Sequence, residues 1–178
     1  MHQDLERIIL SREKLAQRIE VLGKQITEDY QGKKPLMICI LRGAVLFYSD
    51  LCRAIDIPVK MGFVSLSSYG ASAESSGKIK IRQPLGWEAA GEDIVLVEDI
   101  IDTGLTMNMY RKWLLDNGAN SVNICTLLKK PSQIQEIPLS YKGFDIKNEF
   151  VVGYGLDYAE SYRNLPYIGV LKKEIYSK

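Results

Sequence analysis

The sequence predicts an α/β fold in which helices flank a mainly parallel, twisted sheet. Three short apolar runs, at 35–41, 94–97 and 121–128, are the first observation. Continuous runs of this length are typical of strands that are buried on both faces of a parallel sheet. The second observation is that two of the runs lead into a glycine-containing turn, after which helical spacing follows. Strand, turn and helix in this order are the unit from which α/β sheets are built.

Three segments have the residue pattern of helices. The first is expected at 11–30, where Ser11 is a suitable N-cap for an apolar stripe with 4-3-4 spacing, formed by Leu15, Ile19, Leu22 and Ile26. The second is expected at 44–55. The third begins near Gly104 and has apolar residues four positions apart, with Gly118 where a C-cap glycine would lie. The stripe of the first helix is attributed to packing.

Size and composition limit the classes of protein to which the chain can belong. With 178 residues it is expected to be one domain, residues 1–178. The formal net charge of +1 gives no reason to expect nucleic acid or an anionic membrane as a partner. No secretory signal and no membrane-spanning apolar run is expected. A histidine-based metal site or catalytic triad is not expected either, because His2 is the only histidine.

The cysteines indicate the cellular compartment. Cys39, Cys52 and Cys125 lie in apolar surroundings, and no CxxC pair occurs. Buried cysteines behave as small apolar residues, and disulfides are rare in the cytoplasm. The sequence therefore predicts reduced thiols in a cytoplasmic protein.

The segment that follows the second apolar run carries the strongest chemical signal. The run at 94–97 ends on Glu98 and Asp99, and the turn Asp102-Thr103-Gly104-Leu105-Thr106 then leads into the third helix. Backbone N–H groups at the start of a helix lack intrahelical partners, and the helix dipole favours an anion there. Gly104 permits close approach of the backbone, and the two threonines add hydroxyl donors. The turn is therefore predicted to bind a phosphate group.

The acidic residues beside this turn limit the kind of phosphate ligand. Carboxylates would repel a phosphate unless they contact hydroxyl groups or a divalent cation. A phosphorylated sugar with Mg²⁺ supplies both. The alternative, that these residues only cap a helix in solvent, stays open for Thr103. It does not explain two acids at the end of a buried strand, which is where open α/β sheets bind ligands.

Residues 95–107, VLVEDIIDTGLTM, resemble the phosphoribosyl-pyrophosphate (PRPP) signature of the type I phosphoribosyltransferases. The Glu-Asp-Ile-Ile-Asp-Thr-Gly form is similar to the hypoxanthine-guanine branch. The resemblance implies the fold of that family, with a small hood formed by the terminal regions and a flexible lid loop. It also implies purine salvage with Mg²⁺ as cofactor, in which the phosphoribosyl group of PRPP passes to a 6-oxopurine, hypoxanthine or guanine, to give IMP or GMP and pyrophosphate. A homodimer or homotetramer is implied as well.

The resemblance assigns the ribose and 5′-phosphate of PRPP to the acidic turn. The implied contacts are Glu98, Asp99, Asp102, Thr103, Gly104, Leu105 and Thr106. Asp102 is also the implied catalytic residue, which exchanges a proton with the imidazole ring of the purine as general base. The implied metal ligands are Glu98, Asp99 and Asp157.

A second turn resembles the pyrophosphate loop of the same family. Leu41, Arg42 and Gly43 end the first apolar run, and the family can have a cis peptide before the basic residue. Arg42 alone could equally be an exposed charge, although the helix dipole mildly disfavours a cation there. Ala44 departs from the glycine or serine that is common at its position. Arg163 matches the family arginine that contacts pyrophosphate.

The implied purine contacts come from two further segments. Lys129 matches the lysine that contacts the 6-oxo group, whereas Lys130 is expected to be solvated. Phe150 matches the aromatic residue that stacks on the base, and Val151 the residue whose backbone meets the base edge. Asp157 matches the aspartate that follows in this pocket and holds the metal ion in the family.

A polar stretch at 67–78 is expected to join two strands as a mobile lid. Small polar residues dominate it, so it offers little to bury. Ser68 and Tyr69 match the Ser-Tyr pair that closes over the reacting centre in the family.

Other interpretations compete with this one. Gly153-x-Gly155 lacks the third glycine and the helix of a dinucleotide-binding motif. An RNA-binding regulator that shares the PRPP motif should present a basic face, which the net charge does not support. A phosphatase with paired aspartates needs them two positions apart, whereas Asp99 and Asp102 are three apart. Within the enzyme class, a xanthine-preferring relative is the nearest alternative.

Overall fold

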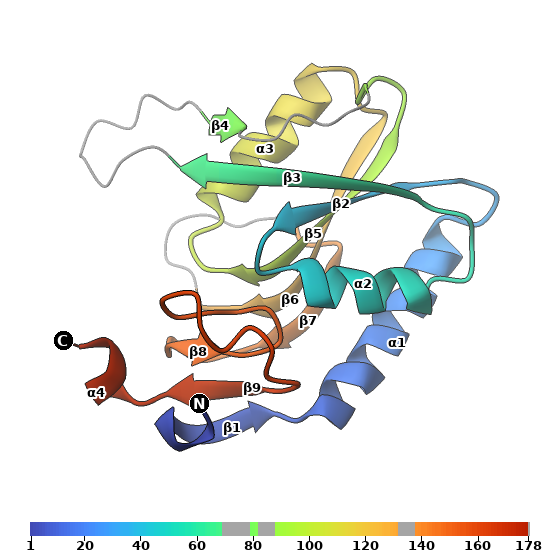
Figure 1. The fold of residues 1–178 in the computed structure, drawn as a ribbon. Coiled ribbons are helices and arrows are strands. Elements are labelled where there is room, and N and C mark those ends of the chain that lie inside the picture. The colour runs from blue at the N-terminus through green and yellow to red at the C-terminus, as the bar shows by residue number, and fades with distance from the viewer. Residues whose placement is uncertain (69–78, 82–87, 132–137, 178) are drawn as a thin grey trace.

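A six-stranded sheet forms the centre of the computed structural model, which describes residues 1–68, 79–81, 88–131 and 138–177 (Figure 1). The strand order is β4-β3-β2-β5-β6-β7. Five strands are parallel and β4 is antiparallel to β3, which confirms the predicted α/β fold. The strands are β2 (Leu36–Leu41), β3 (Lys60–Ser68), β4 (Ile79–Ile81), β5 (Asp93–Ile101), β6 (Ser121–Lys129) and β7 (Tyr141–Asp145).

Helices cover both faces of this sheet (Figure 1). Two lie together on one face and one lies on the other: α1 (Arg12–Asp29) and α2 (Val45–Ala54), then α3 (Leu105–Asp116). The predicted N-cap of α1 is confirmed, because Ser11 Oγ accepts a hydrogen bond from the backbone N–H of Lys14 at 3.4 Å. The predicted end of α3 is confirmed as well, since Gly118 follows the C-cap residue Asn117 with a φ of 89°.

Side chains of the central strands enter the core on both faces of the sheet. On β5, Val95 and Val97 pack in the cluster beneath α1 and α2. Ile94 and Leu96 alternate with them and pack in the cluster beneath α3. All four side chains are fully buried. This two-sided burial explains why the strand has a continuous apolar run in the sequence rather than an alternating pattern.

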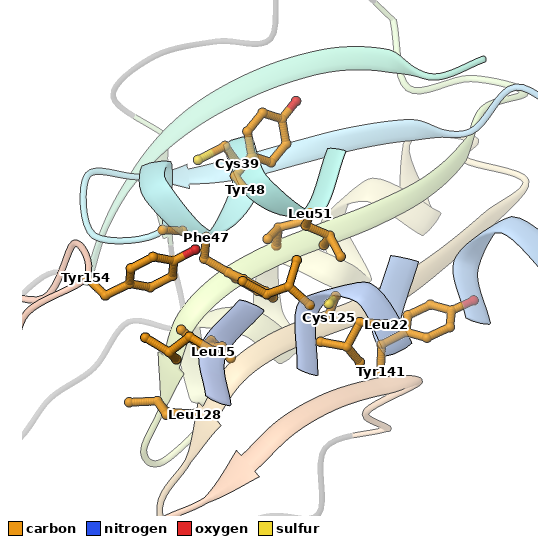
Figure 2. Close-up of a cluster of buried hydrophobic side chains, with 14 of the residues drawn as sticks. Leu15, Leu22, Cys39, Phe47, Tyr48, Leu51, Cys125, Leu128, Tyr141 and Tyr154 are labelled. Carbon is orange, nitrogen blue, oxygen red and sulfur yellow. The ribbon is translucent and has the colours of Figure 1, made fainter. Parts of the chain in front are cut away.

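The larger core cluster joins α1 and α2 to the sheet. Figure 2 shows Leu22 of α1 near Leu51 of α2, with Phe47 on the same side of the sheet, and all three are fully buried. The two helices approach closely at Gly23, where a Cβ atom would lie 2.5 Å from the carbonyl oxygen of Ala54. Packing at this point therefore depends on the absence of a side chain.

A second sheet brings together the two ends of the chain (Figure 1). Its strands are antiparallel, with the order β1-β9-β8, where β1 is Leu5–Leu10, β9 is Ile168–Leu171 and β8 is Val151–Val152. A short 3-10 helix (His2–Asp4) precedes this sheet, and α4 (Lys173–Tyr176) follows it. This is the hood that the resemblance implied.

The three cysteines are free. Burial raises the pKa of Cys39 to about 12 and that of Cys52 to about 11, and burial also raises the pKa of Cys125. Thiols with raised pKa values are poor nucleophiles at neutral pH, so these cysteines act as core residues. Within the described ranges, no helix combines the length and the apolar character needed to cross a bilayer.

Gly23→Ala is expected to lower the free energy of unfolding by about 1–3 kcal/mol, because the added methyl group would push α1 away from α2. Denaturant unfolding followed by circular dichroism measures this change. Lys24→Ala is the matched control, since Lys24 is the next residue of α1 and is exposed. An equal cost for the two variants would contradict the close approach of the helices.

Candidate active site

The carboxyl ends of β2, β5 and β6 lie side by side at one edge of the main sheet (Figure 1). These strands are adjacent and parallel, and Ile101 of β5 is paired with Lys129 of β6. The turn at 41–44 and the segment at 98–106 therefore leave the sheet at the edge where Lys129 also lies. Ligands of open α/β sheets bind at this kind of edge.

The turn between β5 and α3 has the geometry that an anion site requires. Gly104 is the N-cap of α3 and has a left-handed conformation with a φ of 72°. Because Gly104 has no side chain, it makes no cap hydrogen bond to the first N–H groups of the helix, which begins at Leu105. Asp102 and Thr103 are exposed, and Thr106 is half-buried. The structure thus brings all five predicted residues of the turn to the start of α3.

Glu98 and Asp99 crowd two carboxyl groups at the end of β5. Glu98 Oε1 accepts a hydrogen bond from the Asp99 N–H at 3.2 Å, and Asp99 Oδ1 accepts one from the Ile100 N–H at 2.8 Å. Burial, followed by the charge of Asp99, raises the pKa of Glu98. Burial also raises the pKa of Asp99, and the charge of Arg163 opposes that shift. This pair is electrostatically costly in the absence of a positive or hydroxylated ligand.

The turn at 41–44 lies directly against Asp99. The peptide between Leu41 and Arg42 is cis, as the resemblance implied. A Cβ atom at Gly43 would overlap Oδ2 of Asp99, so only glycine fits there while Asp99 keeps its position. Ala44 is fully buried at the start of α2. The cis turn and the acidic pair are therefore one packed unit.

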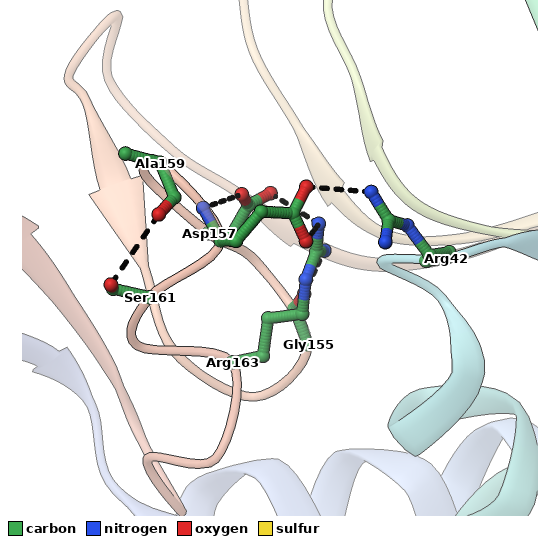
Figure 3. A network of polar contacts seen from close by, with 7 residues as sticks. Arg42, Gly155, Asp157, Ala159, Ser161 and Arg163 are labelled. Atoms are coloured by element: carbon green, nitrogen blue, oxygen red, sulfur yellow. Dashed lines mark hydrogen bonds and ion pairs between the residues drawn. The ribbon is translucent and has the colours of Figure 1, made fainter.

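The loop at 153–163 adds an arginine to this unit (Figure 3). A Cβ atom at Gly155 would overlap the carbonyl oxygen of Gly43, so the two backbones are in contact. Arg163 Nη1 donates a hydrogen bond to the carbonyl oxygen of Gly155 at 2.9 Å, and Arg163 Nη2 lies 2.8 Å from Asp157 Oδ1. Arg42 and Arg163 are thereby held on neighbouring loops, although 41–44 and 153–163 are far apart in the sequence.

The predicted purine residues lie on two different sheets. Lys129 is half-buried at the end of β6, whereas Val151 is buried in β8 of the hood. The ring of Phe150 stacks on Tyr176 of α4, with centroids 4.8 Å apart and an interplanar angle of 20°. Tyr158 contacts the same ring edge-on at 5.6 Å. Because Tyr176 covers one face of Phe150, a base could stack only on the opposite face.

The predicted metal ligands are the carboxylates of Glu98, Asp99 and Asp157. Among the described residues, no group of three or more His, Cys, Asp or Glu side chains is arranged to hold a metal ion by itself. Asp157 instead pairs with Arg163 and accepts a hydrogen bond from the Glu160 N–H at 3.0 Å. The site therefore lacks an all-protein cage, but Mg²⁺ commonly binds through one or two carboxylates, waters and substrate phosphates. The crowded Glu98–Asp99 pair suits that mode.

Sequence reasoning missed Glu160 and Tyr176. Glu160 forms an ion pair with Arg42, and Tyr176 supports Phe150. Neither residue belongs to a recognisable motif, so the sequence held no signal for them. Of the predicted lid, Ser68 is the last residue of β3, and Tyr69 lies outside the described residues.

A double-mutant cycle tests the contact between the cis turn and the acidic pair. Gly43→Ala is expected to lower the free energy of unfolding by about 1–3 kcal/mol, because its Cβ atom would overlap the Asp99 carboxylate. In an Asp99→Ala background the same substitution should cost less, since the overlapping oxygen is gone. Thermal and denaturant unfolding of the four proteins provides the measurement. Equal costs in both backgrounds would exclude the contact.

The chain is similar to proteins of a known family. Residues 7–159 match the phosphoribosyl transferase domain family. The chain is 45% identical to the hypoxanthine-guanine phosphoribosyltransferase of Streptococcus thermophilus (strain CNRZ 1066), with 100% of this chain and 99% of the relative covered. It also resembles the crystal structure of a hypoxanthine phosphoribosyltransferase from Staphylococcus aureus, at 44% identity and a TM-score of 0.95, with 100% and 97% covered.

A third similarity is to a structure whose name includes xanthine. A solved structure named hypoxanthine-guanine-xanthine phosphoribosyltransferase is 37% identical, with a TM-score of 0.87, and the match covers 96% of this chain and 99% of that one. The resemblance to the hypoxanthine-guanine branch is thus confirmed by relatives that match over nearly their whole length. The chain belongs to the phosphoribosyltransferase family.

Proposed function

We propose that the protein is a purine-salvage enzyme, which transfers the 5-phosphoribosyl group of PRPP to hypoxanthine or guanine and releases pyrophosphate. One observation carries this proposal: the anion-binding turn at 102–106, the acidic pair and Arg163 meet at one sheet edge. PRPP has a phosphate, ribose hydroxyls and a diphosphate, and so matches all three groups. Similarity to hypoxanthine-guanine phosphoribosyltransferases over the full chain supports the same activity.

The turn from Asp102 to Thr106 holds the 5′-phosphate of PRPP. Backbone N–H groups from Gly104 and Leu105 onward point at the phosphate, and the hydroxyls of Thr103 and Thr106 add donors. This contact is distant from C1, where the reaction takes place. The binding energy of the phosphate contact is therefore used to orient the reacting carbon, and less of it appears as affinity for PRPP.

Glu98 and Asp99 hold the ribose hydroxyls, directly or through the metal ion. As the C1–O bond to pyrophosphate breaks, positive charge builds on the ribose ring, as in glycoside chemistry. Arg163 and the backbone donors of the turn at Leu41, Arg42 and Gly43 stabilise the departing negative charge. Both arginines already lie on the neighbouring loops that the Gly43–Gly155 contact holds together.

The enzyme requires a divalent metal ion, which we propose to be Mg²⁺. When bound, the ion neutralises charge on the diphosphate of PRPP. Glu98, Asp99 and Asp157 would be its protein ligands, with water and substrate phosphates completing the coordination, because the three carboxylates do not form a cage by themselves. The raised pKa values of Glu98 and Asp99 support this assignment, because a nearby cation would relieve the repulsion between their carboxylates.

The base lies between the sheet edge and the hood. Phe150 stacks on it, Val151 offers backbone groups to its edge, and Lys129 donates to the 6-oxo group. Asp102 exchanges a proton with the imidazole ring as general base. A 6-amino purine would place donors against the ammonium of Lys129, which selects against adenine. We propose that Ser68 and Tyr69 close over this assembly.

Self-association is part of the proposal. Apolar side chains that are more than a third exposed occur on α2 and on the strand β3: Val45, Leu46, Met61 and Phe63. The half-exposed ring of Phe63 packs against the buried ring of Tyr48 in α2, with centroids 5.4 Å apart. Exposed apolar surfaces of this kind mark interfaces, and we propose a homodimer or homotetramer in the cytoplasm. Sedimentation equilibrium gives the mass and distinguishes the two.

The activity is tested by nucleotide formation from PRPP with hypoxanthine, guanine, xanthine and adenine assayed side by side. The proposal expects product with hypoxanthine or guanine and little with adenine. Dominant use of xanthine would move the protein to the xanthine-preferring branch. If no PRPP-dependent product forms while a control enzyme is active in the same assay, the enzyme assignment is rejected.

Asp102→Asn should reduce turnover by roughly 10²–10⁴-fold, because the amide cannot act as general base. The affinity for PRPP should stay nearly unchanged, since the backbone donors of the turn remain. Steady-state kinetics together with PRPP titration by calorimetry separates the two effects. Turnover at the wild-type rate would remove Asp102 from its catalytic role.

Lys129→Met should raise KM for hypoxanthine or guanine on the order of tenfold to a hundredfold, because a hydrogen bond to a charged group is worth about 1.5–3 kcal/mol. KM for PRPP should change far less, and discrimination against adenine should fall. Lys130→Met is the matched control, with the same change of charge at the next residue. Similar effects at both positions would indicate general electrostatics rather than base recognition.

A further inference from the structure

Glu160 lies between the two arginines of the proposed pyrophosphate subsite. Its Oε1 atom is 2.6 Å from Nη2 of Arg42, and its Oε2 atom is 3.6 Å from Nη2 of Arg163. The two arginines belong to different loops, so one carboxylate bridges them. No sequence motif pointed to Glu160, and the proposed reaction gives it no role.

The position of this carboxylate is fixed by the backbone of its loop. The Glu160 N–H donates to Asp157 Oδ2 at 3.0 Å, which closes a tight turn. Ala159 and Glu160 both have left-handed backbone conformations, with φ values of 48° and 59°. Gly155 anchors the same loop against the carbonyl oxygen of Gly43. Residue 160 is therefore directed toward the cis turn by several contacts outside its own side chain.

A carboxylate in this position is chemically similar to the ligand that the arginines are proposed to bind. Guanidinium groups form charge-assisted hydrogen bonds with carboxylates and phosphates alike, through the same N–H groups. The Glu160 carboxylate pairs with Arg42 at 2.6 Å and lies 3.6 Å from Arg163, so it faces N–H groups that a diphosphate would need. It also places a negative charge where the diphosphate must enter.

We infer that Glu160 is an internal competitor of the pyrophosphate group, displaced from the two arginines when PRPP binds and returning when pyrophosphate leaves. This inference rests on the proposed function and deepens it, because it explains how one subsite can bind a substrate group and then release it as product. The side chains of Glu160 and Arg42 are 62% and 67% exposed, so solvent screens their attraction. A weak pair of this kind can be displaced by a ligand of higher charge.

Glu160→Gln tests the inference, because it keeps the size of the side chain and removes its charge. The dissociation constant of inorganic pyrophosphate, measured by calorimetry with Mg²⁺ present, should fall by about two- to fivefold, the range expected for loss of a weak exposed ion pair. KM for PRPP should fall in parallel, inhibition by pyrophosphate should strengthen, and KM for hypoxanthine should not change.

Glu92→Gln is the matched control. It removes the same charge from an ion pair of the same length, with Glu92 Oε1 2.6 Å from Lys60 Nζ, at the opposite end of β5. Affinity for pyrophosphate should stay at the wild-type value in this variant. In an Arg42→Ala background, the effect of Glu160→Gln should shrink, because the competitor then has one fewer arginine to occupy.

Two results would overturn the inference. Equal or weaker binding of pyrophosphate by a folded Glu160→Gln protein would show that Glu160 positions the arginines instead of competing for them. An equal gain in affinity in Glu92→Gln would show that only net charge matters. By contrast, a wild-type protein that binds neither pyrophosphate nor PRPP would overturn the proposed function itself, and the inference with it.

Discussion

The site depends on close contacts at Gly43 and Gly155, which leave no room for a side chain at either position. The carboxylate of Asp99 lies against Gly43, and the carbonyl oxygen of Gly43 lies against Gly155. A methyl group at either glycine would overlap an oxygen atom of the next segment. Three segments from β5, the turn after β2 and the hood are thereby stacked at one sheet edge. Each charged group of the site is positioned relative to this stack.

Local signals were sufficient for the elements that form the scaffold. The runs at 35–41, 94–97 and 121–128 became β2, β5 and β6, because two-sided burial requires apolar residues at every position. Ser11 and Gly118 mark the helix ends as predicted, since capping depends on a few neighbouring backbone groups. The parallel arrangement then brings the carboxyl ends of these strands together, and with them the residues that the PRPP signature singled out.

Other features could not be predicted, because they depend on contacts between distant parts of the chain. β8 has two residues and exists only through its pairing with β9, so it leaves no periodic pattern. The stack of Phe150 on Tyr176 and the ion pair of Arg42 with Glu160 have no local cause. The resemblance to the family assigned a role to Arg163, but it gave no information about the two carboxylates that contact that arginine, those of Asp157 and Glu160.

The distribution of charge around the stack is consistent with a ligand that has hydroxyl groups or a cation in one part and an anionic group in another. On one side, Glu98 and Asp99 have raised pKa values, so this region favours hydroxyl groups or a cation. On the other side, Arg42 and Arg163 favour an anion, yet Asp157 and Glu160 already neutralise part of their charge. Carboxylates from the loop that carries Arg163 therefore balance part of the charge of both arginines. Under the proposed function, a diphosphate would have to replace those internal contacts, and its affinity would then be a difference between two similar interactions rather than the full attraction of two arginines.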